Sequence, residues 1–224
     1  MQYSDYVTSL SIMMGEQDPT NSDFVNILPM VIAYAENRLY RDLDMIGLRF
    51  IDTQTTTANN SYMTLPSQTV IVDGVTIVDA LGNRYQLVPV SREFITFSYP
   101  NVIGATIPVY FAMQDQLTVV FGPWPDQVYT AEVRGVMIPS PLSSSNQTTL
   151  LTTYVPDAFF VASMVFASAY QKNFGAQSDN PQTAQSWEVQ YQMLMKSAAT
   201  WEMRKKFQSE VWSSRQTNPD VTAQ

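Results

Sequence analysis

A block of short segments with β-strand character lies between two helical parts of this chain and limits what it can fold into. The block extends from about residue 50 to residue 136 and is rich in β-branched and aromatic residues. Because helical residues on both sides of an all-β block must pack on it or join each other, we predict an α+β fold. This fold is a helical hairpin or bundle with an inserted antiparallel β-sandwich-like block and a C-terminal extended tail.

The pattern divides the chain into four segments. Residues 1–49 are predicted to form N-terminal helices, 50–138 the β-rich insertion, 139–212 C-terminal helices that pack on the N-terminal ones, and 213–224 a flexible tail. Apolar residues recur on one helix face over residues 24–46, and residues 139–153 are expected to be a linker. Strands are expected at residues 62–65, 69–72, 75–80, 85–90, 107–113, 117–121 and 129–136, with Asp73-Gly74 as a turn and one helical turn at residues 91–99.

A seam of large side chains follows heptad-like spacing near the C-terminus. Trp187, Tyr191, Leu194 and Trp201 lie, with Ala198, at alternating steps of four and three residues. This spacing is typical of a helix that packs along another helix. We therefore interpret the four residues as a helix-packing or oligomer seam rather than as a ligand platform.

Composition points to partner surfaces and against nucleic acid as the main ligand. Hydrophobic residues make up 45% of the chain and charged residues 14%. So low a charge content predicts that partners, first of all further copies of the chain, cover part of the surface. The net charge of −8, from 20 acidic against 12 basic residues, argues against a primary binder of duplex DNA or anionic membranes.

The chain contains no cysteine and no histidine, which removes several kinds of chemistry. Thiolate nucleophiles, disulfides, Cys/His zinc sites and histidine general bases are impossible. No glycine-rich phosphate loop or nucleophile elbow occurs either. We predict a protein that is not an enzyme and that has no catalytic residues, cofactor or metal. The N-terminus lacks a signal peptide and no apolar run is long enough to span a membrane, so synthesis in the cytoplasm without membrane attachment is expected.

Three local clusters have a functional and a structural interpretation. Glu36, Asp42 and Asp44 could bind a hard cation or flank a glycosidic bond, but a solvated helix face neutralised by Arg38 and Arg41 is the preferred interpretation. The loop with Pro123, Trp124 and Pro125 fits a rigid hairpin corner better than a sugar-binding platform. The third cluster consists of the basic residues Arg204, Lys205 and Lys206, followed by Trp212 and Arg215. These cations could meet an acidic partner or phosphates, or could complement a helix dipole, and the sequence favours neither.

Several sequence motifs, taken in order, resemble the head-to-tail adaptor (head-completion, or tail accessory) proteins of tailed bacteriophages, especially short-tailed ones. They are YAENRLYRDLD at residues 34–44, YMTLPS at 62–67, IPVYFAM at 107–113, LTVVFGPWPD at 117–126 and YVPDAFFVASMVFASAY at 154–170. Each motif alone is weak. Their co-linear occurrence covers most of the chain.

The resemblance implies a non-enzymatic virion protein of the head–tail connector. Such a protein forms a ring, expected to be dodecameric, that joins the portal to the tail and lines a channel through which DNA is ejected without specific binding. The helices would pack side by side in the ring and the β-rich part would face the tail nozzle or other tail proteins, with Pro123, Trp124 and Pro125 as a candidate contact loop. The candidate portal-docking residues are Arg204, Lys205, Lys206, Trp212 and Arg215.

Two other classes stay open. A different structural role, such as a tail-nozzle or tail-terminator subunit, would assemble without the portal. A carbohydrate-binding or hydrolytic virion component would use aromatic residues and paired carboxylates of the β-rich block.

Overall fold

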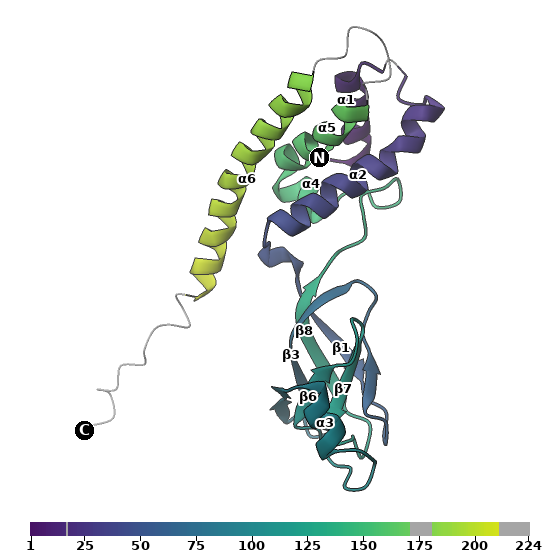
Figure 1. The fold of residues 1–224 in the computed structure, drawn as a ribbon, viewed down its shortest axis with the longest axis vertical. Helices are drawn as coiled ribbons and strands as arrows, with labels where there is room; N and C mark the ends of the chain where they lie inside the picture. The colour runs from purple at the N-terminus through teal and green to yellow at the C-terminus, as the bar shows by residue number, and fades with distance from the viewer. Residues whose placement is uncertain (17, 171–180, 211–224) are drawn as a thin grey trace, which may run out of the picture. The chain divides into compact units, whose positions relative to one another are not determined.

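The computed structural model describes residues 1–16, 18–170 and 181–210, and it divides the chain into two compact units (Figure 1). The helical unit comprises Met1–Ile46 and the chain from Ser140 onward, and the β-rich unit comprises Gly47–Pro139. Six α-helices and two sheets of mostly antiparallel strands occur among the described residues. The expected α+β fold class is therefore confirmed.

The helical unit is built around α5 (Pro156–Tyr170), which is apolar on nearly all sides. Helices α1 (Tyr3–Met14), α2 (Ser22–Asp42), α4 (Leu150–Tyr154) and α6 (Pro181–Glu210) all contact it. Aromatic pairs fix two of these contacts: the ring centroids of Tyr6 and Phe159 are 5.1 Å apart, and those of Tyr34 and Phe166 are 5.0 Å apart. The buried Tyr6 hydroxyl lies 2.9 Å from the Ser163 hydroxyl, so its hydrogen-bonding capacity is satisfied inside the core.

Two helix boundaries differ from the prediction. Helix α2 ends at Asp42 instead of Ile46, because Leu43 adopts an extended backbone and a short 3-10 turn (η1, Ile46–Leu48) follows. Leu43 and Met45 are nevertheless buried, which explains why the apolar pattern continued past the end of the helix. Helix α4 begins within residues 139–153, which were expected to be a linker. Its first turn is capped by reciprocal hydrogen bonds between Thr149 and Thr152.

The β-rich unit contains two four-stranded sheets. The first has the order β1 (Arg49–Thr55), β8 (Thr130–Met137), β3 (Thr69–Val78), β4 (Arg84–Gln86) and is antiparallel throughout. The second has the order β2 (Tyr62–Thr64), β7 (Thr118–Gly122), β6 (Tyr110–Met113), β5 (Val88–Pro89), with β5 parallel to β6. One hydrophobic cluster draws on both sheets; it includes Val75, Ile77, Phe111, Phe121 and Val133.

Three features of this unit were not predicted. Strand β1 was missed, and it pairs with β8 along seven residues. Asp73-Gly74 is not a hairpin turn, since β3 continues through it and the register against β8 shifts between Val72 and Gly74. The expected strand at residues 85–90 is divided between the two sheets as β4 and β5. Helix α3 (Arg92–Ser98) follows, and its cap is the Ser91 hydroxyl, which accepts from the Phe94 N–H.

Candidate interaction site on the helical unit

Helix α6 carries a buried stripe that attaches it to the rest of the helical unit. The stripe consists of Glu188, Tyr191, Met195, Ala198, Glu202 and Lys205, at alternating steps of three and four residues. Tyr191 is fully buried, and Met195, Ala198 and Glu202 are buried as well. This inner stripe is therefore the face of α6 that packs on α5 and α2.

Arg38 of α2 organises the contact with α6. Its guanidinium Nη2 lies 2.6 Å from the Glu188 carboxylate, and its Cζ lies 4.0 Å from the centre of the Tyr191 ring. The Tyr191 hydroxyl in turn donates a hydrogen bond of 2.7 Å to Asp42. The hydrogen bond from Arg38 lowers the pKa of Glu188, so this ion pair is kept charged. Arg38 was expected to neutralise acids of its own helix, but it also joins two helices.

The last described turns of α6 are attached to the chain that follows α2. The buried Glu202 carboxylate accepts a hydrogen bond of 3.2 Å from the Ile46 N–H and one of 2.5 Å from the Lys205 ammonium group. Lys206 forms an ion pair with Asp44. The Lys205 ammonium group also lies 4.5 Å from the centre of the Trp201 ring and 5.0 Å from that of Tyr154. Lys205 and Lys206 are thus already engaged within the subunit.

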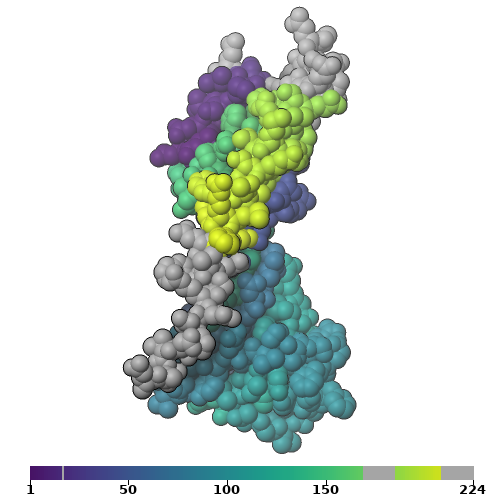
Figure 2. Space-filling model, turned by 90° about the vertical axis from the view of Figure 1, so that its left-hand side faces the viewer, coloured from purple at the N-terminus to yellow at the C-terminus, as the bar shows by residue number. Residues whose placement is uncertain are grey.

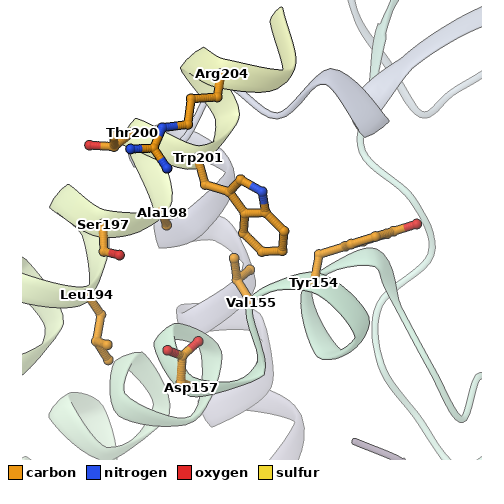
Figure 3. A pocket seen from close by; sticks show the side chains of 9 residues that line it. All are labelled: Tyr154, Val155, Asp157, Leu194, Ser197, Ala198, Thr200, Trp201 and Arg204. Atoms are coloured by element: carbon orange, nitrogen blue, oxygen red, sulfur yellow. The ribbon is translucent and has the colours of Figure 1, made fainter. Parts of the chain in front are cut away.

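An open pocket of about 610 Å³ lies between α6 and the junction of α4 and α5 (Figure 3). Trp201 and Arg204 project from α6, and Tyr154 and Asp157 come from the opposite wall. The remaining lining residues are Val155, Leu194, Ser197, Ala198 and Thr200. Its walls combine apolar side chains with the polar and charged groups of Ser197, Asp157 and Arg204.

The structure places the predicted residues in different surroundings. In the predicted seam, Tyr191 is buried, Trp187 and Leu194 are half-buried, and Trp201 is 49% exposed. In the predicted basic cluster, Arg204 is exposed, and Trp212 and Arg215 lie outside the described residues. Trp201, Leu194 and Arg204 come together at the pocket, a convergence that the one-dimensional spacing did not indicate.

The acid cluster of α2 does not form a site. Glu36 is buried and accepts a hydrogen bond of 2.9 Å from the Leu142 N–H, while Asp42 and Asp44 contact different cations. The interpretation as a solvated helix face was therefore wrong for Glu36. Burial raises the pKa of Glu36 to about 7, and the hydrogen bond from Leu142 opposes that rise. No group of residues in the described parts of the chain could hold a metal ion.

The loop at residues 122–126 is packed into the β-rich unit. Pro125 is buried, Pro123 and Trp124 are half-buried, and the Trp124 indole N–H donates a hydrogen bond of 3.0 Å to the Tyr99 carbonyl. Two apolar side chains on either side of Tyr99 in the sequence are far more exposed, Phe97 at 89% and Ile103 at 87%. These two residues were not predicted to be exposed, although their position beside Ser98 and Gly104 was a usable signal.

Comparison with known proteins identifies one match. A family model described as SU10 adaptor protein matches residues 1–218, and no curated protein matches the chain. The match confirms the resemblance to phage head-to-tail adaptors that the ordered motifs indicated. None of the described helices is long and apolar enough to cross a bilayer.

Proposed function

Because the chain belongs to the SU10 adaptor family, a family of structural head-to-tail adaptor proteins of bacteriophage virions, we propose that it forms a ring that joins the portal to the tail. The match over residues 1–218 carries this proposal, since it includes both units rather than one shared segment. We further propose twelve subunits in the ring, which is the number that matches a twelvefold portal.

Each unit has surface features that suit one of the proposed contacts. The helical unit would pack side by side in the ring, and its C-terminal chain, with Trp212 and Arg215, would reach the portal. The β-rich unit exposes Leu81, Phe97 and Ile103, each at 87% or more. Large apolar side chains so exposed are typical of surfaces that a partner covers, so this unit would contact the tail nozzle or another tail protein.

Charge supports a channel through which DNA passes without binding. The chain has a net charge of −8, from 20 acidic against 12 basic residues. An acidic wall repels phosphates and so lets DNA slide during ejection. We propose that part of the helical unit lines this channel.

Co-expression with the portal protein of the same phage tests the proposal. We expect portal-dependent rings of twelve subunits, counted by electron microscopy and by light scattering after gel filtration. Rings that form equally well without portal would favour a tail-nozzle or tail-terminator subunit. A monodisperse monomer that ignores the portal would refute the adaptor role.

Removal of residues 213–224 tests the proposed portal contact, with the full-length chain as control. We expect the shortened chain to keep its helical circular dichroism and to bind the portal more weakly, because the removed segment includes Arg215. Equal portal binding by the two chains would refute a role of this segment.

A further inference from the structure

Helix α6 has a second apolar stripe on the face that points away from its own unit. This outer stripe consists of Val189, Met193, Lys196, Thr200, Met203 and Phe207, at alternating steps of four and three residues. Since Tyr191 and Met193 are two residues apart, they point about 200° apart around the helix, so the outer stripe lies opposite the inner one. Its four apolar members are exposed, Met203 and Phe207 to 70% and 69%.

No described element of the helical unit covers the outer stripe, and Figure 2 shows this side of α6, in green to yellow, facing the viewer. Apolar residues occupy the first two and the last two positions of this heptad-spaced stripe, with Lys196 and Thr200 between them, and such spacing fits a helix face that packs against another helix. Four large apolar side chains in solvent would forgo the stabilisation that their burial provides. The outer stripe therefore has the features of an unpartnered interface.

The charges within and beside the outer stripe indicate what kind of surface its partner has. Lys196 and Arg204 are exposed and form no ion pair with any described residue. The acids of this helix that lie nearest are already engaged, Glu188 with Arg38 and Glu202 with Lys205. A partner surface should therefore combine apolar side chains with carboxylates that are not paired.

The subunit itself presents such a surface where α1 ends and α2 begins. Ile12, Met13 and Val25 are each 47% exposed or more. The exposed acids Asp18 and Asp23 lie in the same corner, with Glu16 beside them. No lysine or arginine occurs in the first 37 residues, and these three acids form no ion pair with any described residue. We call residues 12–16 and 18–25 the acidic corner, and Figure 1 shows it and α6 on different sides of α5.

We propose that the outer stripe of α6 in one subunit packs against the acidic corner of a second copy of this chain. The two surfaces are different parts of one unit, so the contact is head-to-tail, and repetition of such a contact closes a ring. Apolar side chains would meet along the helix, while Lys196 and Arg204 would face Asp18 and Asp23. This inference rests on the proposed ring and names the surfaces that hold neighbouring subunits together.

Chemical cross-linking tests the contact, because a chain without cysteine allows single thiols to be introduced. Rings of the double variant Ile12→Cys with Met203→Cys, attached to portal, are treated with a bismaleimide. We expect a ladder of covalent multimers from the double variant and none from either single variant. A cross-linked dimer from Met203→Cys alone would show a twofold contact between α6 helices and would overturn the proposal.

A pair of side-chain truncations on α6 distinguishes a contact between subunits from a contact with the portal. Met203→Ser with Phe207→Ser should lower the fraction of chain found in rings by about tenfold, because two of the four apolar contacts of the outer stripe are lost. The matched control, Ile51→Ser with Val128→Ser, removes two similarly exposed apolar side chains, at 69% and 64%, from the β-rich unit and should leave ring formation unchanged. Intact rings of the α6 variant that no longer bind portal would assign the outer stripe to the portal and overturn the proposal. Absence of wild-type rings would refute the proposed function and this contact together, whereas wild-type rings without the cross-linked ladder would refute this contact alone.

Discussion

Glu36→Gln is expected to remove a pH dependence of stability that the wild-type chain shows between pH 5 and 7.5. Glu36 is 4% exposed, and burial raises its pKa from 4.5 to about 7. Because the folded chain holds this proton more tightly than the unfolded chain, the stabilisation is fully present below pH 4.5 and is lost as the pH rises through 7. The wild-type free energy of unfolding should therefore fall as the pH rises.

The size of the effect follows from the difference between the two pKa values. Integrating the linkage relation between pH 5 and 7.5 gives a loss of about 2 kcal/mol in the free energy of unfolding. Few other groups titrate between pH 5 and 7.5 in this chain, since it has no histidine or cysteine. Ordinary carboxyl groups titrate below this window, and lysine and tyrosine titrate above it.

Urea unfolding at half-unit pH steps, followed by circular dichroism at 222 nm, measures the effect. The free energy of unfolding of Glu36→Gln should stay constant from pH 5 to 7.5. The amide oxygen can still accept the hydrogen bond from the Leu142 N–H, but the amide cannot ionise. Glu93→Gln is the matched control: Glu93 is exposed, hydrogen bonds within its own helix turn and with Arg92 lower its pKa, and the variant should keep the wild-type slope. Equal slopes for wild type and Glu36→Gln would refute the assignment of a raised pKa to this buried carboxyl.

Two further substitutions test the packing of each unit. Arg38→Ala removes the ion pair with Glu188 and the contact with the Tyr191 ring. In urea titration it should lower the free energy of unfolding by about 2 kcal/mol, and Arg38→Lys should cause a smaller loss. An unchanged free energy of unfolding would show that Arg38 does not attach α6 to α2. Gly135→Ala should lower the melting temperature more than Gly122→Ala, because a Cβ at 135 would lie 2.0 Å from the Ile71 carbonyl oxygen, whereas at 122 it would meet the movable Tyr99 ring at 2.7 Å. The reverse order in a calorimetric scan would contradict this reasoning.

The sequence predicted helices best where one face is buried along several turns. The apolar residues of α5 and the four-three spacing around Tyr191 both lie in helices of the structure. Periodicity does not tell which neighbour a stripe contacts, however, and in α6 the inner and outer stripes have the same spacing. Their burial separates them, and burial depends on the whole fold.

Local turn chemistry was a poorer guide in the β-rich unit. Asp73-Gly74 has the composition of a hairpin turn, but pairing with β8 on both sides of it outweighs that preference and leaves an irregularity in one long strand. Strand β1 escaped notice because it is at a sheet edge and includes Arg49, Asp52 and Gln54, so the alternation of apolar residues is weak. Glu36 was misread because its partner, the Leu142 N–H, is more than a hundred residues away.

The attachment of Glu202 and Lys206 to residues 44–46 has a mechanical consequence. Residues near the end of α6 are bonded to a segment that leads within three residues into β1. Tension applied to the end of α6 therefore has a direct route to the start of β1 through two polar contacts, beside the packing of α6 on α5. Strain on the end of α6 would therefore be transmitted to the strand at which the β-rich unit begins.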